Sequence, residues 1–394
     1  MSRAVALVRL FLLLTRPGLL SLLALFAVVG LVQGGAADRP GLLVAPWLAV
    51  VGFVVAAVAL NDLCDVALDR INLPGDRSRP LVTGAATRRA VLGVAGVGAV
   101  TALASALAVG GAAVAVVAGG LAFAVAYSVR PLRLADRGSV APLLLPIGYV
   151  AVPFVLGRLA AGGGFGPRDA ALLGGLSLGF VGRILLKDFR DVAGDALLGR
   201  RTALVRHGRA VTCRVSAALW CLGSTALLTV PGLTAVTAVA YAVQLALALV
   251  ALAALARSRH PHRDDALIAA AALLGRGLVL TLLTHLALQQ VPSRLPGWSV
   301  QAVLTAGVVL TAAAVVRTAP PAVRGAASPA GRPSGRIDPW IPAASGRPTG
   351  TASHGWRPAP SGRRSPTPGP TPPPCSPPPG SATTTRSPSR SSPS

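Results

Sequence analysis

Residues 41–69 read GLLVAPWLAVVGFVVAAVALNDLCDVALD, an apolar run that ends in three aspartates. The apolar part, residues 41–61, has the length of about 20 residues that crosses a bilayer as a helix. Asp62, Asp65 and Asp69 follow at intervals of three and four residues, which places all three on one face of a helix. The stretch therefore predicts a membrane-spanning helix with negative charge concentrated at one end.

Comparable apolar segments recur at residues 4–33, 89–109, 111–128, 139–157, 169–186, 208–229, 232–256, 266–288 and 299–316. Of these ten candidates we expect about nine to be true spans, the last two being the least certain. The first segment could be a signal peptide, but it is too long for a typical h-region and Arg16-Pro17 interrupts it. We therefore predict a first membrane helix there, and an all-α polytopic transmembrane helix bundle as the fold class.

The formal net charge of +24 would suit a nucleic-acid-binding protein, but the distribution of the charge excludes that interpretation. Loops after the second, fourth, sixth and eighth spans carry most of the basic residues outside the C-terminal tail, whereas the intervening loops hold only Arg39, Arg158, Arg168 and Arg294. The positive-inside rule accounts for this asymmetry. It predicts an integral cell-membrane protein whose basic loops and both termini are cytoplasmic.

After residue 317 the composition changes to Pro, Ser, Gly, Thr and Arg. Such a segment has too few apolar residues to offset the entropy of ordering it. We predict a transmembrane domain at 1–317 and a disordered cytoplasmic tail at 318–394.

A second acidic block, Asp188, Asp191 and Asp195, follows the sixth span, and both blocks read D-x-x-D-V-A-x-D. Stacked like charges are destabilising without a counter-ion, yet six of the 13 acidic residues lie in these two blocks. Mg²⁺ is the cation that fits best, because it prefers carboxylate oxygens and completes its shell with substrate phosphates. The plainer alternative is a pair of solvated helix ends neutralised by nearby arginines.

Basic residues flank each block, and Arg and Lys both bind phosphate oxygens. Topology alone explains most of the loop arginines, so we single out Arg79, Lys187 and Arg133. Arg183 lies one helical turn before Lys187, inside the sixth span, where an unpaired cation is costly. Its expected partner is an aspartate or a bound phosphate.

Several motifs resemble those of the UbiA family of membrane prenyltransferases. The first block continues through Asn72 and Pro74 to Arg79-Pro80-Leu81-Val82-Thr83-Gly84, and the second runs on to Gly199 and Thr202. Tyr127-Ser128-Val129-Arg130-Pro131-Leu132-Arg133-Leu134 matches the stretch between them, and Arg16-Pro17 matches the start of the first helix. Two extra residues before Arg79, around Gly75 and Asp76, depart from the pattern and could reposition that arginine.

The resemblance implies about nine helices around a central lipid-accessible cavity capped by cytosolic loops. It implies a Mg²⁺ site in which Asp65, Asp69, Asp191 and Asp195 are the catalytic carboxylates. The full predicted metal set adds Asn61 and, as supporting groups, Asp62 and Asp188. The residues expected to contact the diphosphate are Arg79, Tyr127, Arg130, Arg133 and Lys187.

The function that follows is Mg²⁺-dependent transfer of a prenyl group from a polyprenyl diphosphate to an acceptor, which we expect to be aromatic. An allylic carbocation would form in dry surroundings and meet the acceptor. Three alternatives stay open: a membrane terpene cyclase, a transporter, and a non-catalytic lipid-binding protein. Arg276 and His285, in the ninth segment, are candidates for contact with the acceptor, and a structural pairing between helices is the alternative for both.

Overall fold

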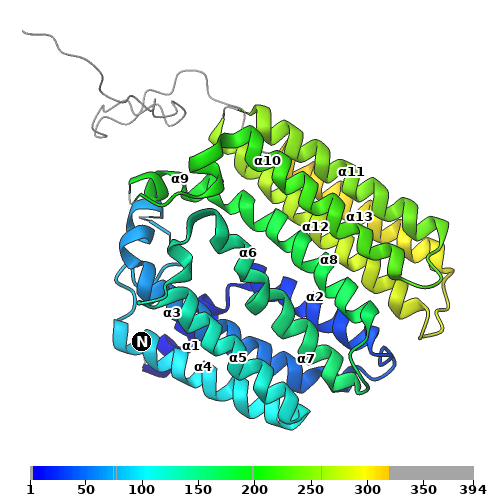
Figure 1. The fold of residues 1–394 in the computed structure, drawn as a ribbon, viewed down its shortest axis with the longest axis horizontal. Helices are drawn as coiled ribbons and strands as arrows, with labels where there is room; N and C mark the ends of the chain where they lie inside the picture. Colours follow the sequence, from blue (N-terminus) through cyan, green and yellow to red (C-terminus); the bar gives the residue numbers. More distant parts are fainter. Residues whose placement is uncertain (1–2, 74, 77, 198, 259, 319–394) are drawn as a thin grey trace, which may run out of the picture. The chain divides into compact units, whose positions relative to one another are not determined.

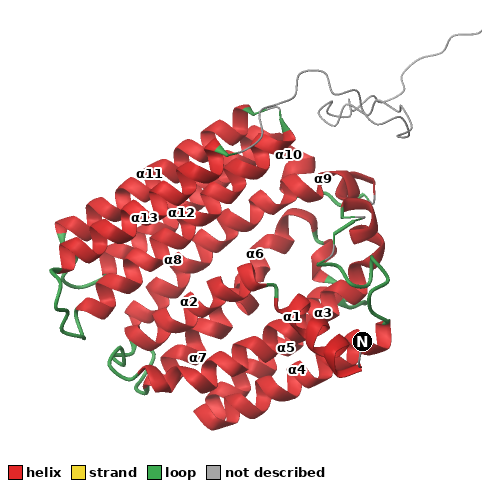
Figure 2. Ribbon diagram, turned by 180° about the vertical axis from the view of Figure 1, so that it is seen from behind, coloured by secondary structure: helices red, strands yellow, loops and turns green. Residues whose placement is uncertain are grey.

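A computed structural model describes residues 3–73, 75–76, 78–197, 199–258 and 260–318 of the chain. Within these residues all regular secondary structure is helical (Figure 2). The main helices are α1 (Arg3–Thr15), α2 (Pro17–Gln33), α3 (Val44–Asn72), α4 (Arg88–Val109), α5 (Gly111–Ser128), α6 (Ala141–Pro146), α7 (Val152–Ala161), α8 (Pro167–Ile184), α9 (Asp188–Leu197), α10 (Ala203–Ser224), α11 (Ala235–Arg257), α12 (Pro261–Leu288) and α13 (Gly297–Arg317). The predicted tail at 318–394 lies outside the described residues except for Thr318.

Short helical segments join some of the main helices. They are the 3₁₀ segments Pro40–Leu43, Leu134–Asp136, Gly138–Val140, Leu185–Lys187 and Thr225–Thr229, and the π-helical segment Ile147–Ala151. The π-helical segment lies between Pro146 and Pro153, neither of which has a backbone N–H to donate to an α-helical ladder. The fifth predicted span is therefore one path across the bundle made of three helical pieces.

The helices confirm the predicted fold class. In the part of the chain that is described, nine helical segments are long and apolar enough to cross a membrane, and a bent pair makes a tenth if it is counted as one span. Large apolar side chains also point outward, as the lipid-facing surface of a bundle requires. Val100, Leu107, Val303 and Leu310 are each between 68% and 73% exposed.

The segment predicted as the first membrane helix, residues 4–33, is divided into two helices at the Arg16-Pro17 interruption. Helices α1 and α2 meet at Arg16, where the two axes bend by 60°. Arg16 has a φ of 44°, in the left-handed region, and Pro17 cannot donate a hydrogen bond to the preceding turn. The break matters for the site, because it directs the Arg16 side chain towards the end of α3.

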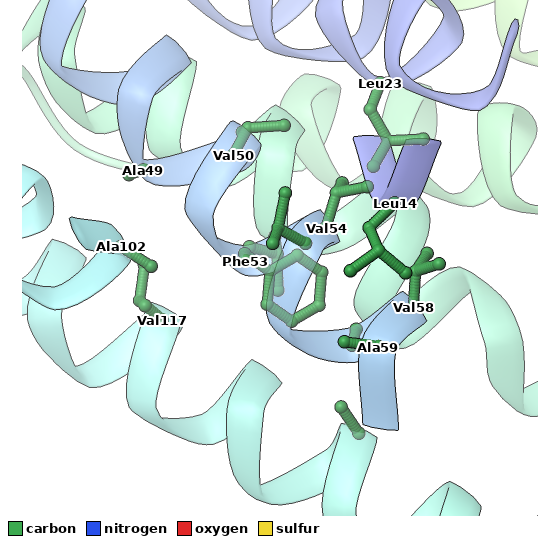
Figure 3. Close-up of a cluster of buried hydrophobic side chains, with 14 of the residues drawn as sticks. Leu14, Leu23, Ala49, Val50, Phe53, Val54, Val58, Ala59, Ala102 and Val117 are labelled. Carbon is green, nitrogen blue, oxygen red and sulfur yellow. The ribbon is translucent and has the colours of Figure 1, made fainter. Parts of the chain in front are cut away.

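The helices form two groups (Figure 1). Helices α1 to α5 and α7 share one apolar core, part of which Figure 3 shows around Phe53, Val54 and Leu14. Helices α10 to α13 share a second apolar core around Leu252 and Leu274. The groups contact each other through α2 with α12 and through α3 with α9. Phe189 of α9 packs against the second core, so the two acidic blocks, on α3 and α9, come from the two sides of the bundle and meet where α3 contacts α9.

Glycine allows very close helix packing in the first group, as is common in membranes. A Cβ atom on Gly30 of α2 would lie 2.0 Å from the Phe154 carbonyl oxygen of α7, and one on Gly157 would lie 1.9 Å from that of Ala27. Gly52 of α3 and Gly98 of α4 form a similar pair. Any side chain at these positions would push the backbones apart.

Polar side chains join the helices of the second group. Gln244 of α11 donates to the Thr281 hydroxyl of α12 at 2.7 Å. His285 is buried and hydrogen-bonded to Thr237 of α11 at 3.2 Å, and it is not among the residues that line the main cavity. His285 therefore pairs helices, which is the alternative that the sequence left open for this residue.

Candidate active site

The two acidic blocks lie in helices, as their spacing predicts. The first occupies the last turns of α3, and the second occupies most of α9, which continues the line of α8 through a single 3₁₀ turn. Both blocks line one cavity of about 640 Å³, to which the first contributes Asn61, Asp65 and Asp69 and the second contributes Asp188, Asp191 and Asp195. Tertiary packing thus brings together carboxylates that are at least 119 residues apart in the chain.

The first block is neutralised by arginines from four other parts of the chain. Asp62 accepts hydrogen bonds from Arg16 and Arg79, and Asp69 pairs with Arg79 at 3.0 Å. These three ion pairs are buried at the junction of α1, α2 and α3, since Asp62 is only 3% exposed. Asp62 does not line the cavity, so its carboxylate serves as an internal counter-ion in this structure.

Asp65, at the centre of the first block, has three partners. Arg133 Nη2 donates to Asp65 Oδ1 at 2.9 Å, Arg200 Nη2 donates to the same oxygen at 3.1 Å, and Asn61 donates to Oδ2 at 2.9 Å. Asp136 completes the network, because it pairs with Arg133 at 2.8 Å and with Arg200 at 2.9 Å. These contacts fasten the loop after α5 and the loop after α9 to the end of α3.

The second block has much less internal neutralisation. Lys187 pairs with Asp191 at 2.9 Å, but its side chain is 56% exposed. The Asp188 Oδ2 atom is buried without a hydrogen-bond partner, and no ion pair of Asp195 occurs among the described residues. Burial, and then the neighbouring Asp191 carboxylate, raise the pKa of Asp195 to about 6, although Arg200 and Lys187 act in the opposite direction. An added cation would therefore be stabilised here.

The residues expected to contact the diphosphate are only partly gathered at the cavity. Arg79, Tyr127 and Lys187 line it. Arg133 reaches the block behind the cavity wall through Asp65. Arg130 is exposed and does not line the cavity. The extra residues before Arg79 do not prevent that arginine from reaching the first block.

Sequence reasoning did not assign Arg16, Asp136 or Arg200 to the site. Arg16 and Arg200 lie within motifs that resemble those of the family. The sequence therefore indicated that they are near the site, but not that they pair with Asp62 and Asp65. Asp136 lies three residues after Arg133, a spacing at which charged side chains pair in a helical turn. That spacing was the one signal that could have indicated its role.

The carboxylates and the Asn61 amide fit a magnesium ion. In the described part of the chain, no group of three or more His, Cys or Asp side chains is arranged to hold a metal by itself. Mg²⁺ commonly uses only one or two carboxylates and takes its other oxygens from water and substrate phosphates. The Asp188 Oδ2 atom, buried and without a partner, is such an available oxygen.

The rest of the cavity is apolar and aromatic. Phe53, Phe123, Tyr149 and Phe180 line it from four different helical segments, and the Tyr149 and Phe180 rings lie 6.0 Å apart. Arg183 of α8 and Arg276 of α12 are the two cations on this deeper wall. The cavity therefore has an acidic end, an aromatic interior and one basic position within it.

Comparisons with known proteins identify relatives of the chain. The chain is 31% identical over 96 residues to the bacteriochlorophyll synthase 34 kDa chain of Chloroflexus aurantiacus, a match that covers 23% of this chain and 29% of that protein. It is 35% identical over 194 residues to digeranylgeranylglyceryl phosphate synthase of Methanoculleus marisnigri, a match that covers 49% of this chain and 66% of that protein. The chain therefore matches less than two thirds of the length of either relative.

A structure solved for work on digeranylgeranylglyceryl phosphate synthase in membranes has the same fold, with a TM-score of 0.54 at 17% identity. The match covers 71% of this chain and 99% of that chain. The apolar helices and this fold make the protein a multi-pass membrane protein. The model of the UbiA prenyltransferase family matches residues 20–276, a range that includes both acidic blocks. More than half of the chain is covered, and the protein therefore belongs to the UbiA prenyltransferase family, as its motifs predicted.

Proposed function

We propose that this protein transfers a prenyl group from a polyprenyl diphosphate to an acceptor inside the membrane, with Mg²⁺ as its cofactor. The observation that carries the proposal is the single cavity with both acidic blocks at one end and aromatic side chains in its interior. A polyprenyl diphosphate has the same division between a charged head and an apolar chain. Its head would lie between α3 and α9, and its chain would lie along Phe53, Phe123 and Phe180.

Several side chains would position the diphosphate. Lys187 and Arg79 line the acidic end of the cavity, where cations stabilise negative charge that develops on the leaving group. Mg²⁺ would be held by one or two of the oxygens that Asn61, Asp65, Asp69, Asp188, Asp191 and Asp195 offer at this end, and when bound it would neutralise charge on the diphosphate. The arginines that already hold Asp62 and Asp65 would keep α3 in place while the head binds.

The reaction breaks the bond between C1 of the prenyl chain and the diphosphate oxygen, and both electrons leave with the diphosphate. The allylic cation lies among aromatic faces, which attract cations and exclude water. A nucleophilic atom of the acceptor then forms a bond to C1 and loses its proton to a carboxylate of the acidic end. Asp65, Asp69, Asp191 and Asp195 stay our candidates for the catalytic carboxylates.

The test is to incubate the purified protein in detergent with radiolabelled geranylgeranyl diphosphate, Mg²⁺ and a panel of acceptors. The panel contains an aromatic acid, an isoprenylglyceryl phosphate and a chlorophyllide, because relatives of the chain are named for lipid-phosphate and bacteriochlorophyll synthesis. Release of diphosphate together with a labelled adduct supports the proposal, and Asp191→Asn serves as the inactive control. If a folded sample releases no diphosphate and forms no labelled adduct, the proposal is contradicted. A lipid-binding or transport function would then be the remaining explanation.

A terpene cyclase is the alternative that the same cavity supports. Its aromatic wall would equally stabilise a cation that attacks its own chain. Cyclic hydrocarbon or alcohol products, formed without any acceptor, would identify that activity. A transporter is less well supported, since coupling sites in transporters usually lie near the bilayer midplane and these blocks lie at helix ends.

We also propose that the acidic end of the cavity faces the cytoplasm. The basic loops after α3, α5 and α9 cluster at this end of the chain's spans, and the positive-inside rule assigns such loops to the cytoplasmic side. Reporter fusions after residue 317 test the orientation. A fluorescent protein fused there should mature, and alkaline phosphatase fused at the same position should be inactive. The reverse pair of results would contradict the proposed orientation.

A further inference from the structure

Two arginines in the interior of the cavity have no counter-ion among the residues that the structure describes. Arg183 lies at the end of α8 and Arg276 lies in the middle of α12, and both line the cavity within apolar spans. Arg183 is five residues before Asp188, so it lies about 7 Å deeper along the helix than the second acidic block. Cations at such positions are costly and commonly mark a functional site.

The contacts of this arginine pair are unusually few. Among the described residues, neither arginine forms an ion pair, and the Nε atoms of both are buried without a hydrogen-bond partner. The single hydrogen bond of the pair runs from Arg276 Nη2 to the Gly18 carbonyl oxygen at 2.5 Å. Both side chains line the same cavity, so two like charges are gathered on one largely apolar wall.

The acids on the same two helices cannot compensate this charge, because they are already paired elsewhere. Asp169, at the start of α8, binds Arg158. Asp264 and Asp265, in the first turn of α12, bind Arg209 and Arg190. An anion from outside the protein is the group that satisfies both guanidiniums, and a carboxylate or a phosphate suits their paired N–H donors.

The surroundings separate this position from that of the donor diphosphate. Arg183 also lines a second, apolar pocket of about 70 Å³, together with Leu22, Phe26, Trp220 and Tyr241. A ligand held by the arginine pair would therefore have an apolar body beside its anionic group. The donor head is expected at the acidic end of the cavity, and its magnesium-binding carboxylates lie on α3 and α9.

We infer that Arg183 and Arg276 bind an anionic group, a carboxylate or a phosphate, on the acceptor. The inference rests on the proposed function and defines the class of acceptor: an amphiphile whose nucleophile is presented to the prenyl C1 while its anion is held deeper in the cavity.

The experiment uses the full chain and two matched pairs of acceptors. The pairs are 4-hydroxybenzoate with its methyl ester, and an isoprenylglyceryl phosphate with the corresponding isoprenylglycerol. The variants are Arg183→Gln and Arg276→Gln, Arg183→Lys as the conservative change, and Arg214→Gln as the control. Arg214 is exposed on α10 and does not line the cavity. Steady-state constants for donor and acceptor are measured separately, together with apparent Tm.

We expect each Gln variant to raise KM for the anionic acceptor by about 10- to 100-fold, as loss of a hydrogen bond to a charged group predicts. KM for geranylgeranyl diphosphate, and the slower reaction with the neutral acceptor, should stay as in the wild type. Arg183→Lys should recover part of the loss. Apparent Tm should not fall, because each substitution removes a buried charge without a partner. The acceptor pair that responds identifies carboxylate or phosphate.

Several results would overturn the inference. A rise in KM for the donor instead of the acceptor would place the donor diphosphate at the arginines. Equal loss with anionic and neutral acceptors, accompanied by a fall in Tm, would make the pair structural. If no acceptor in the panel reacts, we compare the rise in Tm that each anionic compound causes in the wild type and in the variants. An equal rise in the wild type and the variants would contradict the inference. Absence of diphosphate release in the wild type would instead refute the proposed function.

Discussion

In the first acidic block each carboxylate is paired with a cation of the protein, whereas in the second block only Asp191 forms an ion pair within the described part of the chain. Four arginines, Arg16, Arg79, Arg133 and Arg200, reach the first block. The second block has Lys187 alone among the described residues, and the Asp188 Oδ2 atom is buried without a partner. The two blocks have the same D-x-x-D-V-A-x-D motif.

The difference teaches that one motif can serve two physical roles. Charge in the first block is balanced within the folded chain, so this block fastens α3 to the loops around it. Charge in the second block is left for a cation that the protein does not supply. The predictions below test this division, starting from the largest expected effect.

The first block should be the more important one for stability. Asp62→Ala removes the partner that Arg16 and Arg79 share and leaves a buried guanidinium without its counter-ion. We expect the free energy of unfolding in mixed micelles to fall by about 3–5 kcal/mol, the usual cost of breaking a buried ion pair. Asp38→Ala is the control, since Asp38 and Arg39 form an exposed pair. A loss as small as that of the control would mean that the first block does not fasten α3.

The second block should be the more important one for catalysis. Asp191→Asn keeps the shape of the side chain and removes the charge that would hold the cation. We expect kcat to fall by about 10²- to 10³-fold, as for loss of one electrostatic contact to a developing anion. Diphosphate release is the measurement, and Asp265→Asn, which breaks only the exposed pair with Arg190, is the matched control. Activity within tenfold of the wild type would contradict the role assigned to this block.

Removal of magnesium should destabilise the wild type. A ligand at 100 times its Kd stabilises the folded state by about 2.7 kcal/mol, so a Mg²⁺–diphosphate mixture should raise the free energy of unfolding by a comparable amount. Chelation of the metal should reverse the effect. Asp191→Asn should respond much less than wild type, because the cation would lose a ligand. An equal response in that variant would place the cation away from α9.

The first aspartates of the two blocks should respond in opposite directions. Asp188→Asn removes a charge whose buried oxygen has no partner, and without metal we expect the free energy of unfolding to rise by about 1 kcal/mol. The equivalent position of the other block, Asp62, should show the large loss described above. Thermal unfolding with and without chelator compares the two variants. Destabilisation of both would remove the distinction between the blocks.

Much of the fold and part of the site were determined by the sequence itself. Apolar segment length predicts the membrane spans, because it has to match the thickness of a bilayer. Spacing places each acidic block on one helical face, because the helical period is a local property. The blocks are Asp62, Asp65 and Asp69, and Asp188, Asp191 and Asp195. Similar motifs further indicated that the two blocks belong to one site.

The tertiary structure decided which groups meet. Arg16 lies 46 residues from Asp62 in the chain, and Arg200 lies 135 residues from Asp65, so no local spacing relates them. The rotation of α12, which turns Arg276 into the cavity and His285 into the contact with α11, follows from helix packing. The sequence determined where the charges lie along each helix. Packing between distant helices decided which charges are neutralised and which stay available to a ligand.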